Sequence, residues 1–168
     1  MSETAAEMVR SADFSPCRKY RYSLRRRWGD GPAWLMVMLN PSVADEHQDD
    51  ATTRFCMNRA RERGFGSYEA VNLFALIGTD PQCLRIARHP VGKDNDHAIL
   101  AARCRADIIV VAWGDVHWAH RFPLLSRRQS EVSDMLRDGE TYCFGLTKHG
   151  YPRFPRAIKR DVELERYP

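Results

Sequence analysis

The chain has 168 residues, of which 43% are hydrophobic and 29% are charged, a balance typical of a soluble globular protein. No apolar run approaches the roughly 18 residues of a membrane-spanning helix, and the five cysteines lack a C-x-x-C pair, which argues against a disulfide scaffold or a zinc site. The formal net charge of +4 makes the chain mildly basic. We expect one domain over residues 1–168, without a membrane partner and without a cofactor or metal.

The N-terminal part of the chain predicts a flexible segment followed by an edge strand. The first seven residues carry two acids, no base and no apolar stretch, unlike a secretory signal, so we expect a cytoplasmic location. Residues 1–16 are expected to be flexible. Residues 20–28 alternate in polarity and lead into the turn sequence 28–32, which predicts an antiparallel edge strand.

Alternating apolar runs and helical stretches predict the rest of the fold. Four short, near-continuous apolar runs, typical of strands buried on both faces, cover residues 34–39, 70–76, 108–113 and 141–146. Helical spacing between them covers residues 49–63, 95–105 and 124–136. This order predicts a three-layer α/β sandwich, with a central, mainly parallel sheet of about four strands plus the antiparallel N-terminal edge strand.

The residues that follow the predicted strands are candidates for a ligand site. In open α/β sheets, ligands bind in the crevice outside the carboxyl ends of the strands. Polar loops with glycine or proline occupy these places, namely residues 40–42, 74–81, 113–115 and 147–150. Together they supply an amide, a carboxylate, an imidazole and an ammonium group that could converge on one site.

Four residues at or just after these strand ends each have two interpretations. Asn40 can orient a water or a substrate carbonyl, or it can cap its own backbone in an Asx-type turn. Asp45 can activate water, although helix capping explains at least one acid of residues 45–50 without chemistry. Asn72 interrupts an apolar strand, so its buried amide must bond a neighbouring loop or face a ligand. Phe74 either stacks in the same pocket or belongs to the core.

Basic residues gather in two segments on either side of an acidic turn at residues 45–50. Residues 18–27 hold six bases and no acid, and residues 147–168 hold six bases against three acids. This distribution predicts a polyanion-binding rim, unless the two segments are an ordinary solvated strand and tail. The candidate nucleic-acid-binding residues are Arg25, Arg26, Arg27, Arg153 and Arg156. The pair His117 and His120 lacks an obvious third zinc ligand, so we expect no metal there.

Several of these stretches belong to a recognisable combination. Residues 38–45, 50–54, 71–75, 90–96, 112–114 and 145–148 together resemble a family of small, mainly bacterial proteins catalogued as domain of unknown function number sixteen-forty-three. The resemblance covers roughly residues 17 to 160. It implies a family but no established activity.

The order of the motifs also resembles the uracil-DNA glycosylase superfamily and implies a uracil-DNA-glycosylase-like fold. In that superfamily, a loop after the first strand positions the hydrolytic water, an asparagine on a strand reads the pyrimidine edge, and a phenylalanine stacks on the base. Leu39-Asn40-Pro41-Ser42, Asn72 with Phe74, and Trp113-Gly114 stand at comparable places.

This second resemblance implies hydrolysis of the N-glycosidic bond of a modified or damaged base in DNA. Asn40 or Asp45 would orient the water, and His149 or Lys148 would stabilise the departing base. The substrate-binding residues would be Pro41, Ser42, Asn72, Phe74, Trp113, Thr147 and Lys148. A DNA substrate would also require base flipping and a basic rim. Two alternatives stay open: a non-catalytic nucleic-acid or nucleotide-binding module on the same fold, and an enzyme acting on a free nucleoside or nucleotide.

Overall fold

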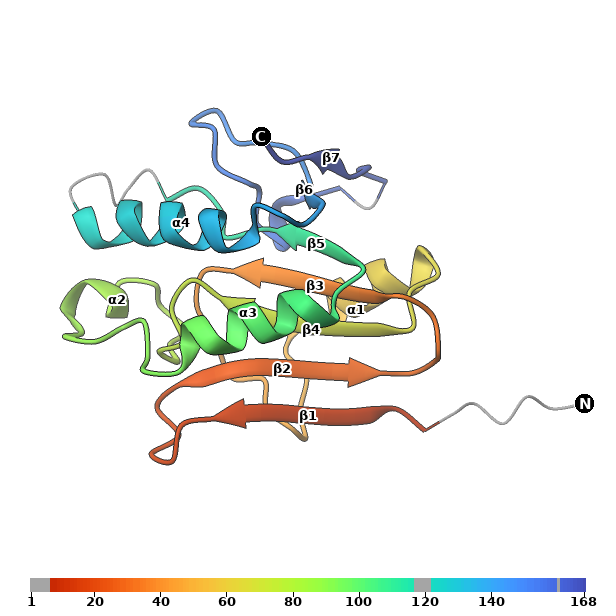
Figure 1. Cartoon of the computed structure of the whole chain (residues 1–168), viewed down its shortest axis with the longest axis horizontal. Coiled ribbons are helices and arrows are strands. Elements are labelled where there is room, and N and C mark those ends of the chain that lie inside the picture. The colour runs from red at the N-terminus through yellow and green to blue at the C-terminus, as the bar shows by residue number, and fades with distance from the viewer. Residues whose placement is uncertain (1–6, 117–121, 160) are drawn as a thin grey trace, which may run out of the picture.

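The computed structural model describes residues 7–116, 122–159 and 161–168, and these residues form a seven-stranded sheet with helices on both faces (Figure 1). The strand order across the sheet is β1-β2-β4-β3-β5-β6-β7. The strands are β1 (Val9–Phe14), β2 (Arg21–Arg27), β3 (Ala33–Met38), β4 (Ser67–Asn72), β5 (Ile108–Val111), β6 (Thr141–Cys143) and β7 (Glu165–Arg166).

The four central strands run parallel, as the sequence predicts. β3 pairs in parallel with β4 and with β5, and β5 pairs in parallel with β6. β4 begins at Ser67 and ends at Asn72, so it lies earlier in the chain than the predicted strand 70–76. Glu69 obscures the apolar pattern, but the strand accommodates it because the Arg105 guanidinium donates to both carboxylate oxygens, at 2.7 and 3.2 Å.

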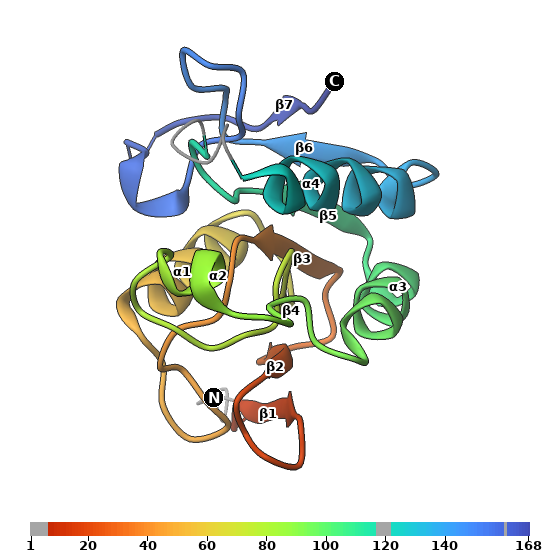
Figure 2. The ribbon, with the colours of Figure 1, turned by 90° about the vertical axis from the view of Figure 1, so that its left-hand side faces the viewer.

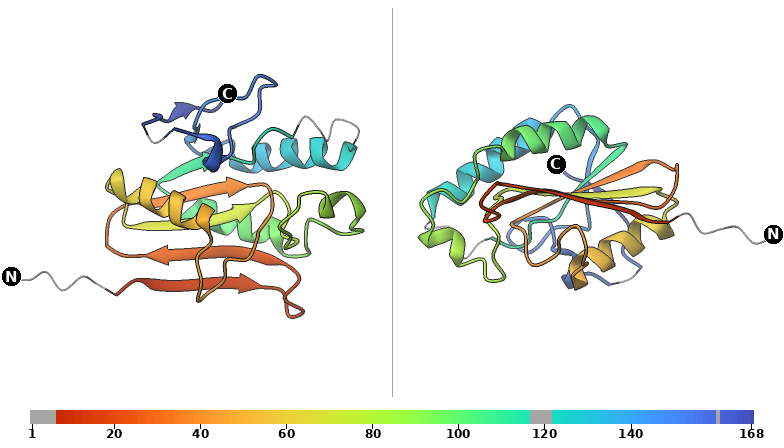
Figure 3. Two further views of the ribbon diagram at one scale, coloured as in Figure 1. Left: turned by 180° about the vertical axis from the view of Figure 1, so that it is seen from behind. Right: turned by 90° about the horizontal axis from the view of Figure 1, so that it is seen from below.

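The helices form two layers around the sheet. The three predicted helices are confirmed as α1 (Ala51–Glu62), α3 (Asn95–Arg105) and α4 (Pro123–Leu136), and a short α2 (Cys83–Ile86) lies between β4 and α3. Figures 2 and 3 show α1 on one face and α3 with α4 on the other. Because side chains alternate along β3, Trp34 and Met36 belong to the apolar core under α1, whereas Leu35 belongs to the core under α3 and α4.

The two edges of the sheet differ from the sequence-based expectation. Residues 9–14 lie within the segment expected to be flexible, yet they form β1, which pairs antiparallel with β2. The predicted edge strand 20–28 therefore lies inside the sheet, between β1 and β4. β1 has no buried residue and mixes polar with apolar side chains, which is typical of an edge strand and gives no clear apolar pattern. At the other edge, the two residues of β7 pair antiparallel with β6.

A bulge in β2 redirects one arginine. Asp13 faces Ser23 and Phe14 faces Arg21 across the β1–β2 ladder, so Tyr22 is an extra residue with no partner on β1. The Tyr22 ring lies against Gly92, ahead of α3. Arg21 instead turns toward the segment ahead of α1, where its Nη1 donates to the Ala44 carbonyl at 2.5 Å.

None of the described helices is long and apolar enough to cross a membrane.

Candidate functional site

A cavity of about 490 Å³ opens at the carboxyl ends of β3, β4 and β5. The chain leaves β3 toward α1 on one face and leaves β5 toward α4 on the opposite face, so the cavity lies at the topological switch point where open α/β sheets bind ligands. Its volume is in the range of small-molecule sites. The walls come from the strand ends, the first turn of α1 and the C-terminal segment, and they include Met38, Asn40, Ser42, Thr52, Asn72, Trp113, Asp115, Phe154 and Arg156.

Asn72 provides an unused amide in the wall of the cavity. The residue is 1% exposed, and neither its Nδ2 nor its Oδ1 has a hydrogen-bond partner among the described residues. Its backbone, by contrast, is well held, because the Asn95 Nδ2 donates to the Asn72 and Leu73 carbonyls at 3.0 and 3.2 Å. A buried polar group without a partner costs about 1–3 kcal/mol. This arrangement favours the interpretation in which Asn72 faces a ligand.

Asn40 also lines the cavity, but its amide nitrogen donates hydrogen bonds to backbone carbonyls. Nδ2 donates to the carbonyls of Gly78, Leu76 and Pro41, at 2.9, 3.4 and 3.3 Å. The Gly78 N–H in turn donates to the Pro41 carbonyl at 2.9 Å. The side chain therefore clamps the loop after β3 to the loop after β4. This geometry agrees with the turn-capping interpretation of Asn40 and places Ser42 in the cavity wall.

An aspartate of the cavity wall contacts a histidine that does not itself line the cavity. Asp115, which lines the cavity, lies on the loop after β5, and His149 lies on the loop after β6. The His149 Nδ1 and the Asp115 Oδ2 are 2.8 Å apart, and about one third of each side chain is exposed (30% and 34%). A turn orients the histidine backbone, because the Thr147 Oγ1 accepts the His149 and Tyr151 N–H groups at 3.3 Å each. The pair can exchange protons at the cavity wall.

Gly114 holds Asp115 in place. Its φ of +87° is left-handed, and a Cβ at this position would lie 3.2 Å from the Phe154 Cβ. The Gly114 N–H donates to the Pro152 carbonyl at 2.9 Å. The loop after β5 therefore packs tightly against the C-terminal segment, which also brings Phe154 and Arg156 to the cavity.

Several predicted substrate or catalytic residues, Pro41 among them, do not line the cavity. Phe74 is fully buried in the core under α3 and α4, so the stacking role predicted for it is not available. Asp45 lies outside the cavity, and its Oδ1 accepts the backbone N–H groups of His47 and Gln48 at 2.8 Å each. These two hydrogen bonds lower the pKa of Asp45, which suits a turn rather than a general base. Thr147 and Lys148 belong to the turn that carries His149 and do not line the cavity.

The predicted nucleic-acid-binding residues 25–27 of the N-terminal basic segment do not line the cavity. Arg27 pairs with Ser67, the first residue of β4, so residues 25–27 approach the amino ends of β3 and β4, opposite the cavity. Arg26 has a fully buried side chain, which rules out the predicted contact with nucleic acid. The C-terminal basic segment does border the cavity through Arg156, whose guanidinium carbon lies 5.6 Å from the centre of the Phe154 ring. Arg153 is exposed, and its Nε donates to the Leu146 carbonyl at 3.1 Å.

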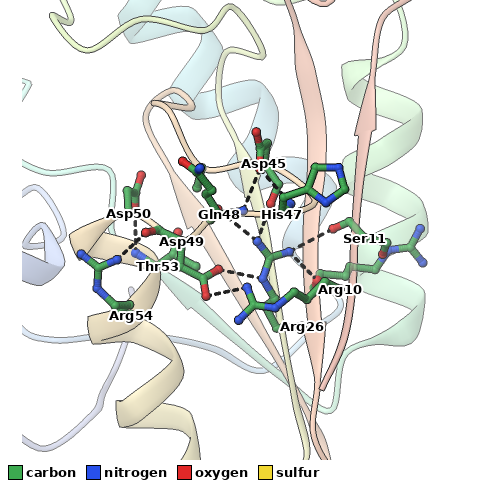
Figure 4. A network of polar contacts seen from close by, with 12 residues as sticks. Arg10, Ser11, Arg26, Asp45, His47, Gln48, Asp49, Asp50, Thr53 and Arg54 are labelled. Carbon is green, nitrogen blue, oxygen red and sulfur yellow. Dashed lines mark hydrogen bonds and ion pairs between the residues drawn. The ribbon is translucent and has the colours of Figure 1, made fainter. Parts of the chain in front are cut away.

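Arg26 instead organises the acidic turn ahead of α1 (Figure 4). Its Nε donates to the Asp49 Oδ1 at 2.8 Å, and its Nη2 donates to the Asp45 carbonyl at 2.5 Å. Arg10 on β1 donates to the other oxygen of Asp49 at 2.7 Å. Among the acids of residues 45–50, Asp49 is therefore neutralised by arginines of the N-terminal strands. The network fixes the start of α1, where the Thr53 N–H donates to the Asp50 Oδ1 at 2.7 Å.

Arg21 is a cavity residue that the sequence analysis does not identify. This residue lines the cavity, is 3% exposed, and its Nε has no hydrogen-bond partner among the described residues. Strand direction offers a signal for it, because the start of an antiparallel strand lies beside the carboxyl end of its neighbour. Arg21 begins β2 and donates its backbone N–H to the Ala75 carbonyl, just beyond β4. The histidine pair at positions 117 and 120 lies outside the described residues.

Comparison with known proteins identifies a family. The family model described as "Protein of unknown function (DUF1643)" matches residues 21–156. The match confirms the first resemblance found in the sequence and covers all the strands and helices that line the cavity. No curated protein and no solved structure matches the chain.

Proposed function

The chain belongs to the DUF1643 family, and we propose that it is a hydrolase that cleaves the N-glycosidic bond of a modified or damaged base in DNA. The buried amide of Asn72, which has no hydrogen-bond partner among the described residues, carries this proposal. A side-chain amide offers one donor and one acceptor in a plane, which complements an N–H beside a carbonyl on the edge of a nucleobase. A site built to pair such an edge discriminates strongly against bases that lack it, because its own polar atoms then stay unpaired.

The Asp115–His149 pair supplies the proton chemistry of the proposed reaction. In this scheme, a water oxygen bonds to the C1′ carbon of the sugar while the bond from C1′ to the base nitrogen breaks, and the bonding electrons go to the base. The water's proton passes to the Asp115–His149 pair, and a proton is then delivered to the departed base. Positioned acid–base groups of this kind contribute about 10²–10⁴-fold to a rate. Asn72, as hydrogen-bond donor, would stabilise negative charge on the departing base.

The C-terminal basic segment supports a DNA substrate. Arg156 borders the cavity, and Arg153 lies on the same segment and is exposed. Arginines at the mouth of a cavity can contact the phosphates beside an extruded nucleotide. Such contacts make binding fall steeply as the salt concentration rises. A free nucleoside or nucleotide is a second candidate substrate, favoured by a cavity volume of about 490 Å³, which can enclose a whole small ligand.

The test is incubation of the protein with DNA oligomers that carry a panel of modified bases, scored for abasic sites. We expect release of at least one base, and Asn72→Ala should reduce the release about 10–100-fold because two hydrogen bonds to the base are lost. Asn58→Ala is the matched control, since Asn58 is an exposed asparagine of α1 and should leave the activity unchanged. Binding of DNA or nucleotide without release of any base would refute the hydrolase and favour the non-catalytic module.

A further inference from the structure

We propose that the end of the cavity formed by Arg21 and the first turn of α1 binds a phosphate group. The link between this phosphate and the substrate rests on the proposed function, because it places a phosphate in the same cavity as the base. The phosphate site itself depends only on Arg21 and α1.

Arg21 is a buried cation in the cavity wall. It is 3% exposed, its Nη1 donates to the Ala44 carbonyl at 2.5 Å, and its Nε has no partner among the described residues. Burial lowers the pKa of the Arg21 guanidinium, so the cavity leaves this cation less stabilised than water would. A bound anion would restore that stabilisation. The planar guanidinium fork suits phosphate oxygens particularly well.

The start of α1 lines the same cavity as Arg21, and the charge of its cap residue Asp50 acts to raise the pKa of the Arg21 guanidinium, which places the two groups near each other. Ala51, Thr52 and Thr53 are all cavity residues and form the first turn of this 12-residue helix. Asp50 satisfies the Thr53 N–H, and the Arg54 N–H bonds the Asp50 carbonyl, so helix geometry leaves the N–H groups of Ala51 and Thr52 without intrahelical partners. The first turn contains no acidic residue. Helix starts of this kind attract phosphates through their N–H groups and the helix dipole.

The nearby charges leave a net attraction for an anion. Asp50 also lines this end of the cavity and contributes one negative charge, although its Oδ1 is engaged with the Thr53 N–H (Figure 4). Asp115 is a second carboxylate of the cavity wall, and Arg21 and Arg156 balance the two acids. The start of the helix adds the equivalent of about half a positive charge.

Arg21 and Asn72 together define a class of substrate. They lie on the adjacent strands β2 and β4, and both reach the same cavity. One group suits an anion and the other suits the edge of a base. A nucleotide carries both functions on one sugar, so the cavity fits a nucleotide whose phosphate lies inside the protein rather than on its outer surface.

Titration of the protein with inorganic phosphate, followed by calorimetry, tests the site. The wild-type protein should bind phosphate saturably, and Thr52→Glu should raise the dissociation constant at least about tenfold by placing a carboxylate at the anion position. Thr52→Glu should still fold, because an acid in the first turn stabilises a helix. Asn58→Glu adds the same charge to an exposed position of α1 beyond its first turn, so it is the matched control and should bind like wild type. No binding by wild type, or equal binding by Thr52→Glu and Asn58→Glu, would overturn the site.

Competition identifies the source of the phosphate. Displacement of inorganic phosphate by nucleoside 5′-monophosphates supports the inference with a free nucleotide as ligand, and displacement only by DNA oligomers supports it with DNA as ligand. Displacement by neither would overturn the link to the substrate.

Base release is measured on the same variants. Phosphate binding without base release would refute the hydrolase and retain the site, whereas base release that Thr52→Glu does not impair would retain the hydrolase and overturn the site's role.

Discussion

The Nδ1 atom of His149 lies 2.8 Å from the Oδ2 atom of Asp115, which joins the loop after β6 to the loop after β5. The two residues are 34 positions apart in the chain, so only the parallel pairing of β5 and β6 brings them together. The contact gives the cavity a titratable pair whose geometry is supported from both sides, by Gly114 and by the Thr147 turn.

Replacing Asp115 with asparagine should lower the rate of base release by about 10²–10⁴-fold, because the amide cannot take up a proton or balance a protonated imidazole. Substrate binding should change much less than the rate. Single-turnover kinetics on the substrate found in the oligomer panel measure both quantities. Asp134→Asn is the matched control, since Asp134 is an exposed aspartate of α4 that pairs with Arg137. Equal rates for the two variants would remove Asp115 from the mechanism.

Replacing Asn72 with leucine should stabilise the fold while it abolishes base release. The substitution removes two buried polar atoms that have no partner among the described residues and fills the space with an apolar side chain of similar size. We expect a gain of about 1–3 kcal/mol in the free energy of unfolding. Urea unfolding of the ligand-free protein measures this change. A clear loss of stability would mean that the Asn72 amide supports the fold itself.

Gly114→Ala should destabilise the protein and impair base release. The left-handed backbone alone costs a residue with a Cβ about 1–2 kcal/mol, and the new methyl group would press on Phe154 at 3.2 Å. Gly64→Ala separates the two effects, because Gly64 has a similar φ of +80° but no heavy atom within 4 Å of its Cβ position. Urea unfolding should therefore show the larger loss for Gly114→Ala, and only that variant should lose activity.

Acid should destabilise the fold through Asp49. Burial raises the pKa of this carboxyl group, but the hydrogen bonds from Arg10 and Arg26 outweigh burial and hold the pKa below its ordinary value. The contribution of Asp49 to stability is therefore fully present above the pKa of an unfolded aspartate, about 3.9, and is lost as the pH falls through the lower folded pKa.

Asp49→Asn should lower stability at neutral pH and flatten its dependence on pH below about 4. The neutral side chain loses its charge-assisted hydrogen bonds to two arginines, each of which contributes about 1.5–3 kcal/mol. Urea unfolding of both proteins from about pH 3 to pH 7 provides the comparison. Parallel pH profiles for the two proteins would show that other carboxylates cause the acid sensitivity.

The central elements of the fold can be predicted because apolar residues form continuous runs in the buried strands and recur at helical spacing in the helices. The strand at residues 108–111 illustrates the first pattern and the helix 95–105 the second, and the predicted bounds of both agree with the structure within two residues at each end. β1 could not be predicted because an edge strand that faces solvent has no apolar pattern. β7 has only two residues, so its pairing depends on where the C-terminal segment docks and not on its own composition.

The candidate site could be predicted only in part. Asn72 is recognisable because an amide is out of place in an apolar strand. Phe74 was misplaced because β4 ends two residues before it and the following backbone turns its ring into the core under α3. Arg21 was missed because the bulge at Tyr22 reverses the alternation along β2. Arg26 looked solvated as one of a basic run, and nothing local indicates that the turn at residues 45–49 covers it.

The Arg26 network should make local opening of the edge strand β1 depend on ligand binding in the cavity. Asp49 accepts hydrogen bonds from Arg10 on β1 and Arg26 on β2, and it directly precedes the Asp50 cap of α1. A ligand that holds the first turn of α1 should therefore also suppress local opening of β1, which makes no contact with the cavity. Amide hydrogen exchange in residues 9–14 should slow upon ligand binding. Occupancy of the site could then be followed at the edge of the sheet even before the ligand's chemical identity is known.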